Sequence, residues 1–150
     1  MIGVERDFDL KSIHEYIQAE AKKRIDEVMA LLYKKGIEFT TAARRKVYAS
    51  NPYNNITYNL VSSVGFSIAR SKQIVETYFP LEATGSEGKA KGEALAEREA
   101  LSICGPEDIV LVLVSGEDYA SYVEANGRDV VTGSSDKFTQ YVQQIWGIYQ

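Results

Sequence analysis

Apolar residues near the start of the chain recur at spacings of three and four, the pattern of one apolar helix face. Asp9 is placed to cap this helix, and Gly36, after two lysines, is placed to end it. We predict a helix over residues 10–35, about 39 Å long at 1.5 Å per residue. A helix of this length either pins a sheet along its whole width, which we favour, or presents part of its face to a partner. Its apolar positions are Leu10, Ile13, Ile17, Ala21, Ile25, Val28 and Leu32.

A short second helix is predicted over residues 42–48, capped by one of two preceding threonines, and a cluster of turn residues at 51–55 follows it. From residue 64 the period of the apolar positions changes to two, which indicates β-strands. Two such runs, separated by Ser71-Lys72-Gln73, predict a β-hairpin over residues 64–79.

The segment after the hairpin, residues 83–88, is predicted to be a flexible connector, and a polar helix over residues 89–103 follows it. Residues 109–114 form a continuous apolar run, as expected of a central strand covered on both faces. The remaining sequence predicts turns and short extended pieces over residues 119–132 and an amphipathic helix at the C-terminal end.

These elements predict the α+β class, with a long N-terminal helix packed on a small, mainly antiparallel sheet. The sheet contains the hairpin, and a middle helix and a C-terminal helix accompany it. The chain has 150 residues, no internal repeat and no linker long enough to separate two domains, so residues 1–150 are predicted to form a single structural domain.

Composition excludes several classes of protein. Hydrophobic residues make up 45% and charged residues 25%, which are ordinary values for a globular protein. The longest apolar run is far shorter than the roughly 20 residues that span a bilayer, and the charged N-terminal sequence differs from a signal peptide. We therefore expect no membrane partner and a protein made in a cytoplasm. The single cysteine, Cys104, is interpreted as a small buried hydrophobic residue.

The net charge of -4 is unevenly distributed. Residues 1–50 contain ten Lys/Arg and eight Asp/Glu, whereas residues 51–150 contain seven and thirteen. This division permits head-to-tail attraction between copies or neighbours, and it is equally compatible with an uneven surface.

Candidate catalytic patterns are incomplete. Residues 83–90, Ala-Thr-Gly-Ser-Glu-Gly-Lys-Ala, approximate a phosphate-binding loop, but Ala90 stands where magnesium requires Ser or Thr. His14 is the only histidine and is interpreted as a surface residue. The acidic pairs Glu107-Asp108 and Glu117-Asp118 are interpreted as solvated turns. We therefore predict a protein that is not an enzyme, with no catalytic residue, no metal and no cofactor.

Three consecutive bases, Arg44, Arg45 and Lys46, form the other candidate site. They suit contact with nucleic-acid phosphates or with an acidic protein partner. The alternative function that they suggest is a small non-enzymatic binding or regulatory module.

After the apolar run and a short turn, the chain continues with Tyr119-Ala120-Ser121-Tyr122-Val123-Glu124 and, three residues later, Gly127. This segment resembles the tail-completion and minor-tail family of tailed bacteriophages. That family carries a Tyr-Ala-x-x-Val-Glu-x-Gly segment after a central strand, and the glycine comes one residue later in this chain. A weaker likeness lies at residues 57–63, similar to the family's Thr-x-x-Leu-Arg-x-Ser segment, with Val61 in place of the arginine. The residues of this segment that belong to the motif or are candidates for an interface are Tyr119, Ala120, Tyr122, Val123, Glu124 and Gly127.

The resemblance implies a structural virion protein of the neck or upper tail, assembled in the host cytoplasm. Its copies would form a ring that joins the head-side connector to the tail proteins, with DNA passing through the channel without sequence-specific contact. The residues of the first motif would then lie at an interface, or they would only stabilise the bend after the strand.

Overall fold

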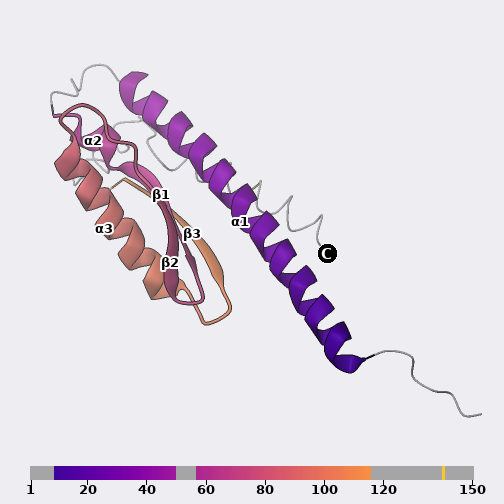
Figure 1. Ribbon diagram of the computed structural model, residues 1–150. Coiled ribbons are helices and arrows are strands. Elements are labelled where there is room, and N and C mark those ends of the chain that lie inside the picture. The colour runs from indigo at the N-terminus through magenta and orange to yellow at the C-terminus, as the bar shows by residue number, and fades with distance from the viewer. Residues whose placement is uncertain (1–8, 50–56, 116–139, 141–150) are drawn as a thin grey trace, which may run out of the picture. The chain divides into compact units, whose positions relative to one another are not determined.

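A computed structural model describes residues 9–49, 57–115 and 140 of the chain. The chain divides into two compact units, residues 1–32 and 33–150. The helices are α1 (Leu10–Ala49), α2 (Asn59–Ser62) and α3 (Ser86–Ile103) (Figure 1). The first unit contains the N-terminal turns of α1, and the second contains the rest of α1 and the other elements. The prediction of a single domain stays a prediction.

Helix α1 confirms the predicted start but not the predicted end. The carboxylate of Asp9 caps the helix, because its Oδ1 accepts a hydrogen bond from the backbone N–H of Lys11 at 3.0 Å. The helix then continues through Gly36 to Ala49, so the predicted stop and the separate helix over residues 42–48 are wrong. Gly36 is buried, and a Cβ atom there would lie 2.7 Å from Cζ of Phe66. The glycine therefore serves close packing and does not end the helix.

The sheet contains three antiparallel strands in the order β2-β1-β3, which confirms the predicted α+β class. The strands are β1 (Val64–Arg70), β2 (Gln73–Tyr78) and β3 (Ile109–Ser115). Strands β1 and β2 form the predicted hairpin, and its two turn residues, Ser71 and Lys72, have φ angles of 51° and 64°. Two successive left-handed residues match the tight turns that suit twisted hairpins.

Strand β1 occupies the centre of the described sheet, whereas residues 109–114 were predicted to do so. Six consecutive residues of β1 are buried, while β3 is half-buried over most of its length. The side chains of β3 nevertheless alternate between two apolar faces, because Val112 lies opposite Ser67 and Leu113 lies opposite Phe66. Apolar contacts on both faces therefore explain the continuous run of β3 without a central position.

The two faces of β1 differ in residue size. On one face, the ring of Phe66 lies 5.6 Å from that of Tyr33 in α1, measured between centroids, and Gly36 packs on the same ring. On the other face, Ala69 packs with Ala100 of α3 and with the buried, free Cys104. The turns of α1 from Tyr33 onward and α3 therefore cover opposite faces of this strand, and the buried interpretation of Cys104 is confirmed.

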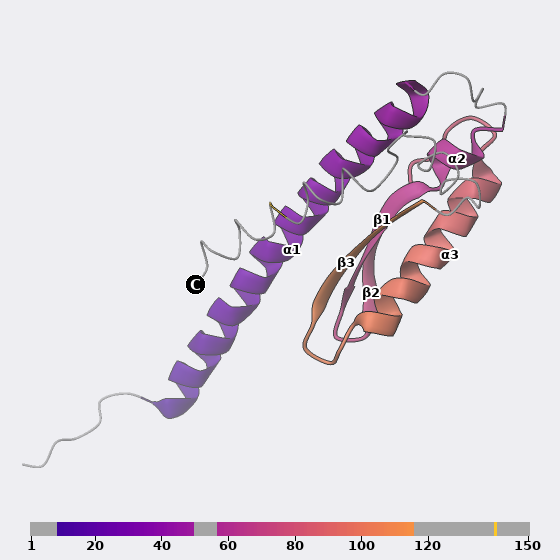
Figure 2. The ribbon, with the colours of Figure 1, turned by 180° about the vertical axis from the view of Figure 1, so that it is seen from behind.

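Helix α3 lies along the sheet in both views (Figure 1, Figure 2). It begins at Ser86, so the predicted connector over residues 83–88 contributes its last three residues to the helix. Gly88 is buried, and its backbone N–H donates to Oδ1 of Asn59 in α2 at 3.1 Å. The buried positions of α3 are four residues apart. They are Gly88, Gly92, Ala96 and Ala100.

The predicted turns over residues 119–132 and the predicted C-terminal helix lie outside the described part of the chain.

We predict that Gly92→Ala destabilises the second unit. A Cβ atom at this position would lie 2.5 Å from the carbonyl oxygen of Ser63 and 2.7 Å from Cε1 of Phe79. Overpacking of this kind costs about 1–3 kcal/mol, and alanine regains about 1 kcal/mol of helix propensity. Urea denaturation should therefore show a lower free energy of unfolding, while Arg98→Ala on the exposed side of the same helix leaves it nearly unchanged. An increase in stability for Gly92→Ala would contradict the close packing.

Candidate functional site

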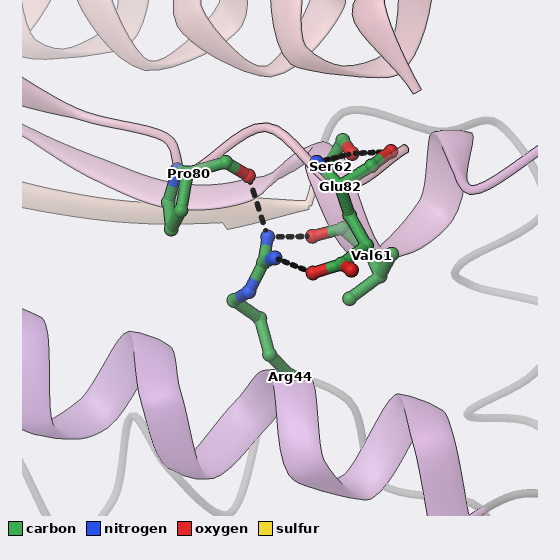
Figure 3. A network of polar contacts seen from close by, with 5 residues as sticks. All are labelled: Arg44, Val61, Ser62, Pro80 and Glu82. Carbon is green, nitrogen blue, oxygen red and sulfur yellow. Dashed lines mark hydrogen bonds and ion pairs between the residues drawn. The ribbon is translucent and has the colours of Figure 1, made fainter. Parts of the chain in front are cut away.

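Arg44 is a buried arginine near the C-terminal end of α1, with 9% of its surface exposed. Its Nη1 donates to the backbone carbonyl of Val61 and, at 2.8 Å, to that of Pro80 (Figure 3). Its Nη2 forms an ion pair with Oε2 of Glu82 at 3.2 Å. One guanidinium thus joins α1, α2 and the segment that follows β2.

The carboxylate and backbone of Glu82 complete this Arg44 cluster, which consists of Arg44, Tyr48, Val61, Ser62, Pro80 and Glu82. The backbone N–H of Glu82 donates to Oγ of Ser62 at 3.0 Å. The hydroxyl of Tyr48 hydrogen-bonds with Glu82, and burial together with this acceptor and its negative charge raises the pKa of Tyr48 above 10.0. The positive charge of Arg44 is therefore balanced within the chain.

The structure does not bring the three predicted bases together on one surface. Arg44 is buried, Arg45 is exposed and Lys46 is half-buried. Consecutive helical residues point about 100° apart, since a turn contains 3.6 residues. Of the three, Arg44 is engaged with carbonyl oxygens of its own chain, and Arg45 presents its side chain to solvent.

The other candidate residues occupy ordinary structural positions. Lys89, from the loop that approximates a phosphate-binding motif, pairs with Glu93 one turn later at 3.6 Å. Asp108 accepts a hydrogen bond from the backbone N–H of Gly105 at 2.8 Å, within the turn before β3. His14 is exposed on α1, as predicted. Within residues 9–49 and 57–115, no group of three or more His, Cys, Asp or Glu could hold a metal ion.

No helix among the described residues combines the length and apolar character needed to cross a bilayer.

The motif that carries the phage resemblance, residues 119–127, lies outside the described residues, as do Glu117 and Asp118. The weaker motif over residues 57–63 is described in full. Within it, Asn59 caps the start of α3, and the hydroxyl of Ser63 donates to the carbonyl of Leu60 at 2.8 Å. This segment therefore links α2 to both neighbouring helices.

A second candidate site is a row of apolar side chains on the N-terminal turns of α1. We call this row the α1 ridge. Leu10 and Ile17 are 63% and 59% exposed, and the neighbouring Tyr16 is 67% exposed. Large exposed apolar patches commonly mark interaction surfaces. The ridge consists of Leu10, Ile13, Ile17, Ala21, Ile25 and Val28, of which Ile25 and Val28 are half-buried.

Sequence reasoning missed the acidic partner of Arg44. Glu82 lies 38 positions further along the chain, and no local pattern connects the two residues. The segment that contains Val61 and Ser62 was singled out only through the resemblance, which carries no information about Arg44. The ridge, in contrast, follows the apolar face that the sequence predicts.

We predict that Arg44→Met lowers the free energy of unfolding by about 2–4 kcal/mol, because it removes the donor to the buried carbonyl of Val61 and the half-buried carbonyl of Pro80, and the cation that pairs with Glu82. Arg45→Met, one residue away and exposed, is the matched control and should change it by less than about 0.5 kcal/mol. Chemical denaturation measures both. Equal effects of the two substitutions would contradict the structural role of Arg44.

We predict that Tyr48 ionises above pH 10.0 in the folded protein, because burial and Glu82 favour the neutral phenol. A raised folded-state pKa stabilises the fold below the unfolded-state pKa, and this contribution is lost as the pH rises through the folded-state value. The difference between the ultraviolet titrations of the native protein and Tyr48→Phe isolates this tyrosine. Glu82→Gln should lower its pKa, and an unchanged midpoint would refute the contact.

The Arg44 cluster connects elements of the fold to one another. The α1 ridge, in contrast, is a surface on which another molecule can pack. Comparison of the chain with protein families, curated proteins and solved structures found no match.

Proposed function

We propose that this protein is a non-enzymatic structural subunit that acts by assembling with other protein chains. Following the sequence resemblance, we further propose that it belongs to the neck or upper tail of a tailed-phage virion. There its copies form a ring that joins the head-side connector to the tail and surrounds the DNA channel.

The observation that carries the assembly proposal is the exposure of the α1 ridge. Leu10, Ile13 and Ile17 are all exposed, although their spacing is that of a helix face built for burial. Burying such a side chain contributes about 1.5–3 kcal/mol relative to leaving it in water. A protein partner that covers the ridge supplies this stabilisation.

The element order of the described residues also supports the proposal. A long N-terminal helix, the segment over residues 57–63 and a hairpin occur in the order on which the resemblance rests. The alternative, contact with nucleic acid through Arg44, Arg45 and Lys46, is less well supported. Arg44 binds carbonyl oxygens of its own chain, which leaves the alternative with two of its three bases.

Virions of a phage that encodes this chain provide the test. Mass spectrometry of purified particles should detect the protein in several copies per particle, and native mass spectrometry of the isolated protein should detect a ring. In a phage carrying Ile17→Glu, the amount of protein per particle should fall. Ala19→Glu is the matched control, because Ala19 is exposed and lies on the opposite face of the helix. Absence from wild-type particles, together with a monomer at every concentration, would reject the proposal.

A further inference from the structure

The segment after β2, residues 80–85, contains a backbone conformation that its sequence disfavours. The backbone N–H of Gly85 donates to the carbonyl of Glu82 at 2.9 Å, which closes a tight turn. Ala83, the first central residue of this turn, has a φ angle of 44°. A positive φ favours glycine at this position, and a residue with a Cβ atom is disfavoured there by about 5–30-fold in population. Contacts outside the turn must therefore hold Ala83 in place.

The chain is fixed on both sides of Ala83. On one side, the backbone N–H of Glu82 donates to Oγ of Ser62 in α2 at 3.0 Å. On the other side, Oγ1 of Thr84 donates to the carbonyl of Thr57 at 3.2 Å. Strained backbone persists where the surrounding contacts over-determine it. Ala83 lies one residue from each of these contacts, so it cannot relax while both are made.

The segment that receives these contacts is strained as well. Tyr58 precedes α2 with φ 55° and ψ 13°, which is a left-handed conformation. A Cβ atom at Gly85 would lie 2.3 Å from the carbonyl oxygen of Tyr58, so the two segments touch through their backbones. Two left-handed residues other than glycine thus lie on the two sides of one contact. Strain of this kind clusters at switch regions of proteins.

We propose that residues 80–85 form a strap that Arg44 holds in a strained conformation, and that loss of the Arg44 contacts releases the strap. Arg44 donates to the carbonyl of Pro80 at the start of the strap and pairs with Glu82 beside Ala83 (Figure 3). Because Arg44 belongs to α1, this contact couples the C-terminal turns of α1 to α2 and to the start of α3. The inference does not rest on the proposed function.

Ala83→Gly tests the strain. Ala83 is exposed, so the substitution removes a Cβ atom without leaving a cavity. Glycine adopts the same φ freely, and urea denaturation should show the folded-to-unfolded ratio rise about two- to fivefold. Ala94→Gly, at an exposed position inside α3, is the matched control and should lower this ratio about fivefold. An unchanged or lower ratio for Ala83→Gly would overturn the proposal.

The same substitution in the Arg44→Met background tests the role of Arg44. If Arg44 holds the strap, the strap relaxes in this variant and Ala83→Gly no longer raises the ratio, so the two effects are not additive. The full gain should remain in Arg45→Met, the exposed control. Glu82→Gln removes only the charge of the ion pair and supplies a second background if Arg44→Met does not fold. The gain there should be smaller than in the native chain, and an equal gain would overturn the proposal.

Amide hydrogen exchange detects the release itself. In folded Arg44→Met, or in Glu82→Gln, the amide of Gly85 should exchange at least about tenfold faster relative to that of Cys104. The Cys104 amide is the internal reference, because it donates to the carbonyl of Ala100 at the other end of α3. Arg45→Met should leave both amides unchanged. Equal acceleration of the two amides would show a loss of global stability without release, which contradicts the proposal.

Discussion

The close approach of α3 to α2 and to the residue that precedes β1 is the constraint on which the second unit depends. A Cβ atom at Gly88 would lie 2.0 Å from the carbonyl oxygen of Asn59, and one at Gly92 would lie 2.5 Å from that of Ser63. Only glycine, which has no Cβ atom, fits at these two positions of α3. Where α3 meets β1 the residues are small as well, since Ala69 packs with Ala100, and the large side chain of Phe66 points to the opposite face. That face receives the turns of α1 from Tyr33 onward, so one steric requirement determines how both helices pack.

The Arg44 cluster joins the C-terminal part of α1 to α2 and to the segment after β2 through polar contacts. Helix α2 has only four residues, and one that short depends on its surroundings for stability. Arg44 supplies donors to the carbonyl groups of Val61 and Pro80, and Glu82 balances its charge. A buried carbonyl group without a donor would cost about 1–3 kcal/mol, so the arginine stabilises the packing of α1 against α2 and the segment after β2. The same contacts bury Arg44, so it does not share an exposed surface with Arg45.

Local periodicity was sufficient to predict the hairpin, the start of α1 and most of α3, because these patterns span neighbouring residues. The role of Gly36 within α1 could not be predicted from neighbouring residues. A glycine after two lysines is typical of a helix end, and its actual role depends on Phe66, thirty residues further along. The apolar run of β3 was ambiguous for a similar reason, since burial on two faces gives the same pattern at the centre and at an edge. The candidate site was predicted from three bases that are consecutive in the sequence. In the structure Arg44 points into the protein, whereas Arg45 points into solvent.

The two parts of α1 have different surfaces, and this difference leads to the functional proposal. Residues such as Phe39, Ala43 and Val47 are buried, whereas Leu10 and Ile17 expose apolar side chains. Helices in proteins are stabilised mainly by packing of an amphipathic face, so a partner that covers the exposed apolar residues would stabilise the N-terminal turns. The most direct measurement is amide hydrogen exchange of residues 10–28 at low and high protein concentration, with α3 as the internal reference. The account predicts slower exchange in residues 10–28 at high concentration and no change in α3. Identical exchange of residues 10–28 at both concentrations would contradict it.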